Sequence, residues 1–144
     1  MADELDTVVE NLRAILDGVA GIKKAHGTPL EGFSEFPLAI VWVEGGTLRG
    51  GAGSPAVGVH QVFADVHLMR ANLPGDVAVA RPFVLKVWTA VAAEVTLSGA
   101  CEYCLLRSYR GPGTMRQADG SSTTVGVHFE FDVKVHHSGI TFSA

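Results

Sequence analysis

Cysteine, clustered basic charge and long hydrophobic runs are all scarce in this sequence. It has two cysteines, and no apolar run approaches the ~18 residues that span a bilayer. The 11 lysine and arginine residues are scattered, with Lys23 and Lys24 as the one adjacent pair, and the formal net charge is -4. Proteins that bind nucleic acid by neutralising phosphates use clustered basic residues, so this charge distribution argues against that class.

The sequence also has no recognisable secretion signal. Its first residues, MADELD, are acidic, whereas a secretory signal begins with a basic region. We therefore expect an intracellular, unprocessed chain with no membrane association. Its 144 residues suit a single domain that buries roughly two-thirds of its unfolded surface and needs no disulfide to fold. Hydrophobic residues make up 47% of the chain, which is apolar for a soluble monomer and indicates buried subunit contacts.

An amphipathic helix is the clearest local prediction, within residues 3–21. Seven apolar residues there follow the i, i+3, i+4, i+7 spacing of one helical face: Leu5, Val8, Val9, Leu12, Ile15, Leu16 and Val19. Asp3 is placed to cap the amino terminus, where the helix dipole favours acidic side chains. Gly18 or Gly21 is expected to end the helix in a left-handed conformation.

A strand is predicted on each side of the glycine-rich stretch VEGGTLRGGAGSPAVGVH, residues 43–60. LAIVWVE, residues 38–44, is short, apolar and partly β-branched. Residues 59–73 alternate, with Val62, Ala64, Val66 and Leu68 on one face and Gln61, Phe63, Asp65 and His67 on the other. We predict that the two strands form a hairpin with a flexible loop at about residues 45–58.

A second helix and a second hairpin are predicted in the rest of the chain. The helix covers roughly residues 75–95, with an apolar stripe of Phe83, Val84, Val87, Trp88, Val91, Ala92 and Val95. Pro82 either occupies its first turn or kinks it near residue 81. Strands follow at residues 102–110 and 124–137, joined by a second flexible loop at about residues 111–123. In the last strand, Phe129, Phe131, Val133 and Val135 share one face.

This order of elements, α-β-β-α-β-β, favours an α+β fold. We expect one domain over residues 1–144, a mostly antiparallel sheet and helices packed on one face of it.

The glycine-rich stretch is not typical of a nucleotide-binding loop. A phosphate loop requires Gly-Lys-Ser/Thr running into a helix, and a dinucleotide fingerprint requires a strand, a tight turn and a helix. Here a strand leads to a strand, so a hairpin connection is the better interpretation.

The chemically reactive residues do not form a recognisable catalytic or metal-binding pattern. Cys101 and Cys104 have no second cysteine pair to complete a zinc site, and a strand would point them to opposite faces. His128 and His136 share a strand face but lie roughly 26 Å apart, and the adjacent His136 and His137 point away from each other. Ser54 lacks the strand-to-helix elbow of hydrolase nucleophiles. We predict no catalytic residues, no cofactor, no metal ligands and no enzymatic activity.

Several phrases of the sequence resemble the tail terminator and tail-completion proteins of siphophage-type, long-tailed bacteriophages. They are the helices VVENLRAILDGVAGIKKAH and VAVARPFVLKVWTAVAAEVTLSG, the strands FPLAIVWVEGG and HQVFADVHLMRANLP, and the closing GVHFEFDVKVHH. A proline before the first strand, here Pro37, and an ARPF-like helix start belong to the same pattern. The resemblance covers nearly the whole chain and depends on element order and size rather than on an invariant motif.

The resemblance implies a virion protein whose function is mechanical. Members of this family are small α+β subunits that form a homo-oligomeric ring in the tail, usually a hexamer. The ring caps the tail tube, ends its polymerisation and provides the surface that joins the head-side connector protein. Genome DNA passes through the ring non-specifically, and assembly takes place in the host cytoplasm. The implied partners are copies of this chain, the tail tube protein and the connector.

The two predicted loops are the candidate contact regions, because long polar loops can order when a partner binds. The candidate contact residues are Arg49, Gly50, Gly51 and Ser54 in the first loop, and Arg110 and Arg116 in the second. We expect residues 45–57 to order only when the ring meets its partner. For each of these residues, an ordinary solvated loop is the alternative.

Two other functions remain open at this stage. A head-closure or neck adaptor protein would use similar surfaces in the same assembly. A small α+β ligand-binding module or enzyme belongs to a different class, and Trp42, Trp88 and the histidine-rich last strand are the features that suggest it.

Overall fold

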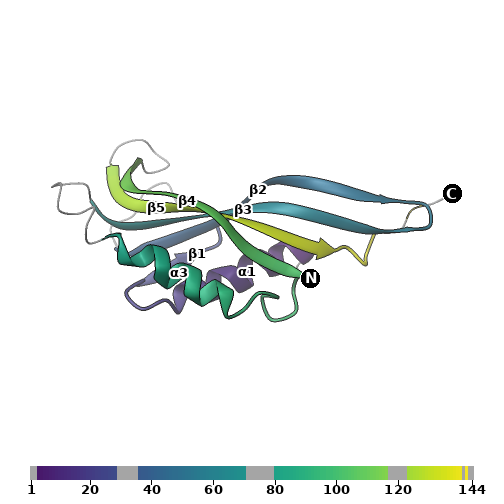
Figure 1. Cartoon of the computed structure of the whole chain (residues 1–144), viewed down its shortest axis with the longest axis horizontal. Helices are drawn as coiled ribbons and strands as arrows, with labels where there is room; N and C mark the ends of the chain where they lie inside the picture. Colours follow the sequence, from purple (N-terminus) through teal and green to yellow (C-terminus); the bar gives the residue numbers. More distant parts are fainter. Residues whose placement is uncertain (1–2, 29–35, 71–79, 117–122, 141, 143–144) are drawn as a thin grey trace.

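The residues that the structure describes form a twisted five-stranded sheet with two helices on one face (Figure 1). The structure is a computed structural model, and it describes residues 3–28, 36–70, 80–116, 123–140 and 142. Its elements are α1 (Glu4–Asp17), β1 (Lys24–His26), β2 (Leu38–Gly51), β3 (Ser54–Arg70), α3 (Pro82–Ala92), β4 (Tyr103–Arg116) and β5 (Thr123–His136). The strand order is β1-β2-β3-β5-β4. The predicted α+β class is confirmed.

The sheet is mixed rather than wholly antiparallel, because of a strand that the sequence pattern did not reveal. β1 pairs in parallel with β2, from Lys24 opposite Leu38 to His26 opposite Ile40. Three residues are too short to show a period of two, so no alternation marks this strand. The backbone N–H of Ala25 donates to Asp17 Oδ1 at 2.9 Å, which ties β1 to the end of α1.

α1 forms as predicted, with Asp3 at its amino-terminal cap. The backbone N–H of Asp6 donates to Asp3 Oδ1 at 2.7 Å. The helix ends at Gly18 with φ of -88°, which is right-handed, and Gly21 with φ of 98° is the left-handed residue. Gly21 lies beyond the helix, so it turns the chain towards β1 rather than ending α1.

α3 ends three residues before the predicted helix does. It begins at Pro82 and ends at Ala92, so Pro82 occupies the first turn, where its missing N–H costs no hydrogen bond. Residues 75–79 of the predicted helix lie outside the described residues. Val95 belongs to the turns that follow α3 rather than to the helix.

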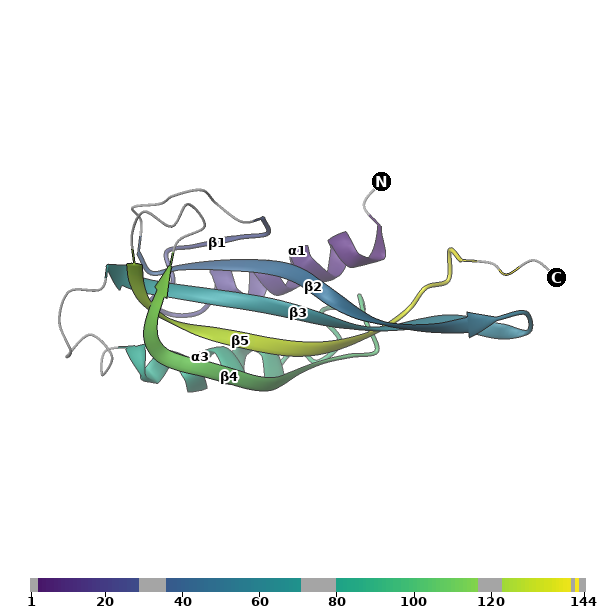
Figure 2. The same ribbon diagram turned by 90° about the horizontal axis from the view of Figure 1, so that it is seen from above.

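The prediction of a loop at residues 45–58 is wrong. β2 and β3 stay paired from Leu38 opposite His67 to Gly51 opposite Ser54, and only Ala52 and Gly53 turn the chain. Register shifts at Glu44 and Gly50 increase the local twist without ending the ladder. The result is the β2–β3 ribbon, residues 45–59, which extends beyond the helices (Figures 1 and 2). Glycine has a low strand propensity, but hydrogen bonds to the partner strand hold these residues in a strand, and local propensity does not include that pairing.

The second predicted loop, at residues 111–123, is also too long. β4 continues to Arg116, with a register shift between Arg110 and Gly113, and β5 begins at Thr123. Gly111 adopts φ of 100°, which accommodates this irregularity. Residues 117–122 lie outside the described part of the chain.

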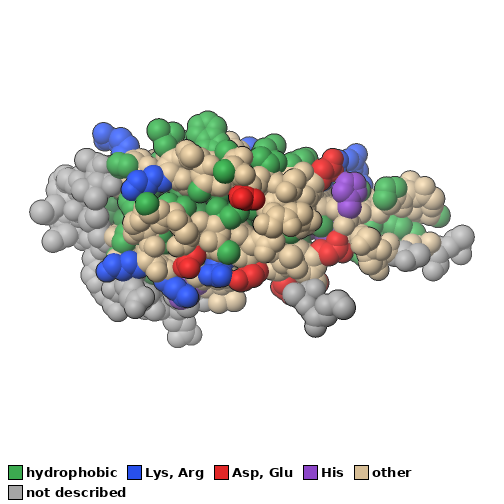
Figure 3. All heavy atoms as spheres, turned by 90° about the horizontal axis from the view of Figure 1, so that it is seen from below, with side chains coloured by type: hydrophobic (Ala, Val, Ile, Leu, Met, Phe, Trp, Pro, Cys, Tyr) green, Lys and Arg blue, Asp and Glu red, His purple; other side chains and the backbone are tan. Residues whose placement is uncertain are grey.

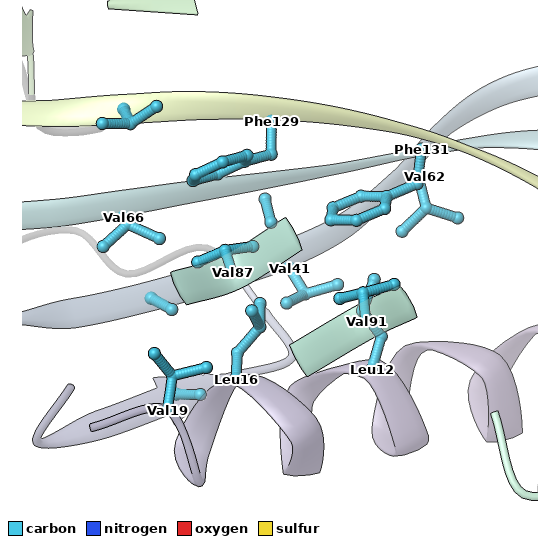
Figure 4. Packing of buried hydrophobic residues seen from close by; sticks show 14 of the residues in the cluster. Leu12, Leu16, Val19, Val41, Val62, Val66, Val87, Val91, Phe129 and Phe131 are labelled. Carbon is cyan, nitrogen blue, oxygen red and sulfur yellow. The ribbon is translucent and has the colours of Figure 1, made fainter. Parts of the chain in front are cut away.

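The core lies between the helices and one face of the sheet (Figure 4). The alternation predicted for β3 and β5 is confirmed: Val62, Ala64, Val66, Leu68, Phe129, Phe131, Val133 and Val135 are all buried there. Val8, Leu12 and Leu16 of α1 pack against them. Within the described residues, neither helix is long and apolar enough to cross a membrane.

Candidate functional site

The first group of predicted contact residues lies together at the far end of the β2–β3 ribbon. Arg49, Gly50, Gly51 and Ser54 line a shallow hollow of about 290 Å³ with Pro55 and Val57. They flank the turn at Ala52 and Gly53, so strand pairing holds the backbone that carries Arg49. This end of the molecule is a narrow, two-stranded projection rather than a loop.

The second group lies at the opposite end of the long axis (Figure 1). Arg110 is exposed on β4 and lines a polar hollow of about 410 Å³ with Asp65 and His128. Arg116 ends β4 opposite Thr123, and its side chain lies outside the described residues. The structure therefore does not bring the two predicted contact groups together.

An exposed apolar surface lies where α3 and the edge strand β4 meet, and the sequence prediction missed it. Its three large exposed side chains are Leu85 at 63%, Trp88 at 53% and Tyr109 at 51%. Leu85, Trp88 and Tyr109 line a hollow of about 360 Å³ with Val84 and Leu106. We call these residues the α3–β4 surface. Figure 3 shows hydrophobic side chains gathered along one border of the helix-covered face.

The sequence contained a signal for this surface. The apolar stripe of the second helix included Trp88 and Val95 beside Val84, Val87 and Val91, and such a stripe is wider than one core-facing side. In the structure Val84, Val87 and Val91 are buried, whereas Trp88 and Val95 are exposed. The excess width of the stripe marked a second apolar face.

Both edges of the sheet are open along most of their length. β4 pairs with β5 alone, and β2 has β1 as a partner only from Leu38 to Ile40. The outer backbone edge of β4, and that of β2 from Val41 to Gly51, have no partner strand among the described residues. Unpaired strand edges present N–H and C=O groups that can pair with another chain.

The open face of the sheet carries a network centred on His128. Its Nδ1 lies 2.5 Å from Asp65 Oδ1, and its Nε2 lies 3.4 Å from Glu130 Oε1. The Ser108 hydroxyl donates to Glu130 at 2.8 Å, and this bond lowers the pKa of Glu130. Phe63 contacts the imidazole edge-on, with ring centroids 4.9 Å apart. The arrangement links β3, β5 and β4 across the open face of the sheet, and His128 Nε2 is buried within it.

His60 and His137 meet at the base of the β2–β3 ribbon. Their Nε2 atoms are 2.9 Å apart, and the rings are perpendicular with centroids separated by 5.1 Å. Burial, and to a lesser extent the charge of His137, lowers the pKa of His60. The prediction that His136 and His137 point apart is confirmed, because His136 is exposed and lies 2.8 Å from Glu102. Extending the alternation of β3 by two residues from Val62 would have placed His60 on the buried face.

Glycines make room for this histidine pair. A Cβ at Gly46 would lie 2.7 Å from the Val59 carbonyl oxygen and 3.0 Å from His60 Nδ1. A Cβ at Gly58 would overlap the ring of His60 and lie 3.0 Å from His137 Nε2. The glycine-rich stretch thus serves close packing inside a strand pair rather than an open loop.

The two cysteines are buried in the core. Cys101 precedes β4, so strand alternation does not apply to it, and the expectation that Cys101 and Cys104 point to opposite faces is wrong. Burial raises the pKa of Cys101 to about 11 and that of Cys104 to about 12, which keeps both thiols protonated. Within the described part of the chain, no three His, Cys, Asp or Glu side chains gather in a group that could hold a metal ion.

Comparison of the chain with protein-family models and with curated protein sequences gives no match.

Proposed function

We propose that this chain is a structural subunit that assembles with copies of itself into a ring of the tail terminator type. The ring caps a phage tail tube, ends its polymerisation and presents a joining surface to the head-side connector, with DNA passing through the central hole. The resemblance of the sequence to that family motivates the proposal. The α+β fold, with its helices on one face of the sheet, is compatible with it.

The α3–β4 surface is the observation that carries the self-assembly part of the proposal. Leu85, Trp88 and Tyr109 are each more than 50% exposed and line one hollow between α3 and β4. Contiguous apolar surface of this kind marks protein contacts. Burying it against a partner stabilises the complex by roughly 25 cal/mol for each Å² of apolar area removed from water. Aromatic residues are also enriched at the anchoring positions of such contacts.

The open edges of the sheet suit a head-to-tail arrangement. In a ring, each subunit presents one surface to the next subunit and a different surface to the previous one. β4 on one side and β2 beyond Ile40 on the other are two such unlike edges. Pairing between neighbours satisfies both edges and removes the aggregation hazard of an exposed strand.

Charge is also distributed unequally between the two sides. α1, on the β1–β2 side, carries Glu4, Asp6, Glu10 and Asp17 against Arg13. α3 and β4 together carry Lys86, Arg107, Arg110 and Arg116 and no acidic residue. Opposite charges on unlike surfaces favour head-to-tail contact over contact between like surfaces.

The oligomeric state in solution tests the proposal. We expect a closed ring by native mass spectrometry and negative-stain microscopy of the purified chain. Leu85→Lys combined with Trp88→Ser should convert the ring to monomers. Leu48→Ser is the matched control, because Leu48 is 74% exposed on the ribbon, away from the α3–β4 surface.

Addition of purified tail tubes separates this function from that of a neck adaptor. A tail terminator binds tube ends and stops further tube growth, whereas a neck adaptor binds the connector and leaves growth unchanged. A strictly monomeric chain that leaves tube growth unchanged contradicts the proposal.

A further inference from the structure

We propose that His60 and His137 form an acid-sensitive clasp that holds the segment after β5 against the β2–β3 ribbon. This segment, called the post-β5 segment, comprises residues 137–140 and Phe142. Acidification opens the clasp, releases the segment and uncovers an apolar side of the ribbon. The proposal concerns one subunit and does not depend on the ring.

The contact between the two imidazoles depends on their protonation. A hydrogen bond between two Nε2 atoms 2.9 Å apart requires one nitrogen to carry a proton and the other to accept it. Two neutral rings or one neutral and one charged ring meet this requirement. Two protonated rings do not, because both nitrogens then donate and two positive charges lie side by side.

The surroundings give little compensation for a second charge. His60 is 5% exposed, and its register partners are Gly46 on β2 and Val133 on β5, neither of which is charged. On the described residues of α1, Glu4 is the charged group in contact with the pair, and its Oε1 lies 3.5 Å from His137 Nδ1 on the far side of that ring. One carboxylate balances one positive charge, so double protonation leaves an excess.

The pair is built into the fold rather than resting on a mobile surface. Gly46 and Gly58 leave the space that the two rings occupy, and a Cβ at Gly58 would overlap His60. His137 also extends the sheet by one hydrogen bond, because its backbone N–H donates to the Ala56 carbonyl at 2.9 Å. The clasp therefore fixes the point at which the chain leaves β5.

The post-β5 segment covers part of the ribbon. The backbone N–H of Ile140 donates to the His137 carbonyl at 3.1 Å, which turns the chain. The Phe142 ring lies against Gly50, where a Cβ would be 2.5 Å from Phe142 Cζ. Ile140 and Phe142 line a mainly apolar hollow of about 260 Å³ with Leu48, Ala56 and Val57. Release of the segment exposes this apolar side of the ribbon.

The direction of the pH effect follows from the lowered pKa of His60. An unfolded or released His60 titrates near 6.5, whereas the clasped His60 titrates below that value. As the pH falls through 6.5, the open form takes up protons more readily than the clasped form. The population of the open form therefore rises until the pH reaches the pKa of the clasped His60, below which it stays constant.

Amide hydrogen exchange and NMR of the full chain test the proposal. We follow the protection factor of the His137 amide, corrected for intrinsic exchange, and the order of the Ile140 methyl group from about pH 7.5 to about pH 5. In the wild type, protection should fall by up to about tenfold per pH unit within the window below 6.5. Ile140 should become mobile over the same range.

Two variants make the result specific. His60→Gln keeps a hydrogen-bonding side chain but removes the group whose pKa is lowered in the clasp, so its protection should not depend on pH in this range. His136→Gln is the matched control, since His136 is the adjacent, exposed histidine bound to Glu102, and it should behave as the wild type. His60→Asn serves as a second non-titrating variant should His60→Gln fold poorly. Protection that is independent of pH in the wild type overturns the proposal, and so does pH dependence that survives in His60→Gln.

Discussion

The sheet runs through two regions: the helix-covered part, which we call the body, and the β2–β3 ribbon. Different interactions stabilise these two regions. In the body, α1 and α3 cover one face, and side chains such as Phe129 and Val62 are fully buried (Figure 4). The ribbon extends beyond the helices, and Leu48 on it is 74% exposed. Hydrophobic burial dominates the stability of the body. The ribbon depends on backbone pairing and on close contacts that its glycines permit.

Deletion of a core ring should have the largest effect and tests the difference directly. Phe129→Ala removes a fully buried side chain that stacks on Phe131, with ring centroids 6.5 Å apart. We expect a loss of about 3–5 kcal/mol in the free energy of unfolding, measured by urea denaturation. Leu48→Ala on the ribbon is the control, with an expected change within about 0.5 kcal/mol. Equal losses in the two variants would show that the ribbon shares the body's dependence on burial.

Adding one methyl group to the ribbon should have an intermediate effect. In Gly46→Ala the new Cβ lies 2.7 Å from the Val59 carbonyl oxygen and 2.9 Å from His60 Cα, so the backbone must shift. We expect about 1–3 kcal/mol of destabilisation by urea denaturation, together with altered imidazole shifts of His60.

Gly45→Ala is the matched control for this change. Gly45 is the adjacent residue, and a Cβ there meets nothing within 4 Å. Its stability should therefore stay close to that of the wild type. Similar behaviour of the two variants would contradict the role assigned to close packing in the ribbon.

The smallest expected effect is the reaction of the two cysteines with a thiol reagent, because both are buried in the body and should react very slowly. A pKa raised from 9.0 to about 11 leaves Cys101 with about a hundredfold less thiolate than an ordinary cysteine, and Cys104 has less still. A thiol reagent such as Ellman's reagent should label the folded chain slowly and the urea-unfolded chain rapidly. Leu48→Cys places an exposed thiol on the ribbon and should react at once. Rapid labelling of Cys101 in the folded wild type would indicate that the body opens near β4.

The same comparison shows where sequence reasoning succeeds. The cap at Asp3, the helical face of α1 and the alternation of Val62 to Leu68 depend on neighbours within a few residues of one another. Within the described residues, such local patterns predicted α1, α3, four of the five strands and most of the buried face. β1 escaped prediction because its partner, Leu38–Ile40, supplies the pairing that three residues cannot encode by themselves.

The candidate surfaces were harder to predict from the sequence, because they depend on contacts between residues far apart in the chain. His60 and His137 are 77 positions apart, and nothing near either residue indicates the other. Trp88 belonged to the apolar stripe predicted for the second helix, and in the structure it is 53% exposed. The ribbon was assigned to a loop because glycine propensity is local and the pairing of β2 with β3 is not.

The sequence by itself determined the α+β class, the course of the two hairpins and the residues that face the core, because hydrophobic periodicity operates within single elements. Only the tertiary structure decided that the glycine-rich stretch is a paired ribbon, that a histidine pair lies at its base, and that α3 and β4 share an exposed apolar surface. Each of these features depends on which elements lie side by side. The glycines illustrate the division: their freedom is local, but the rings for which they make room come from β3 and from the post-β5 segment.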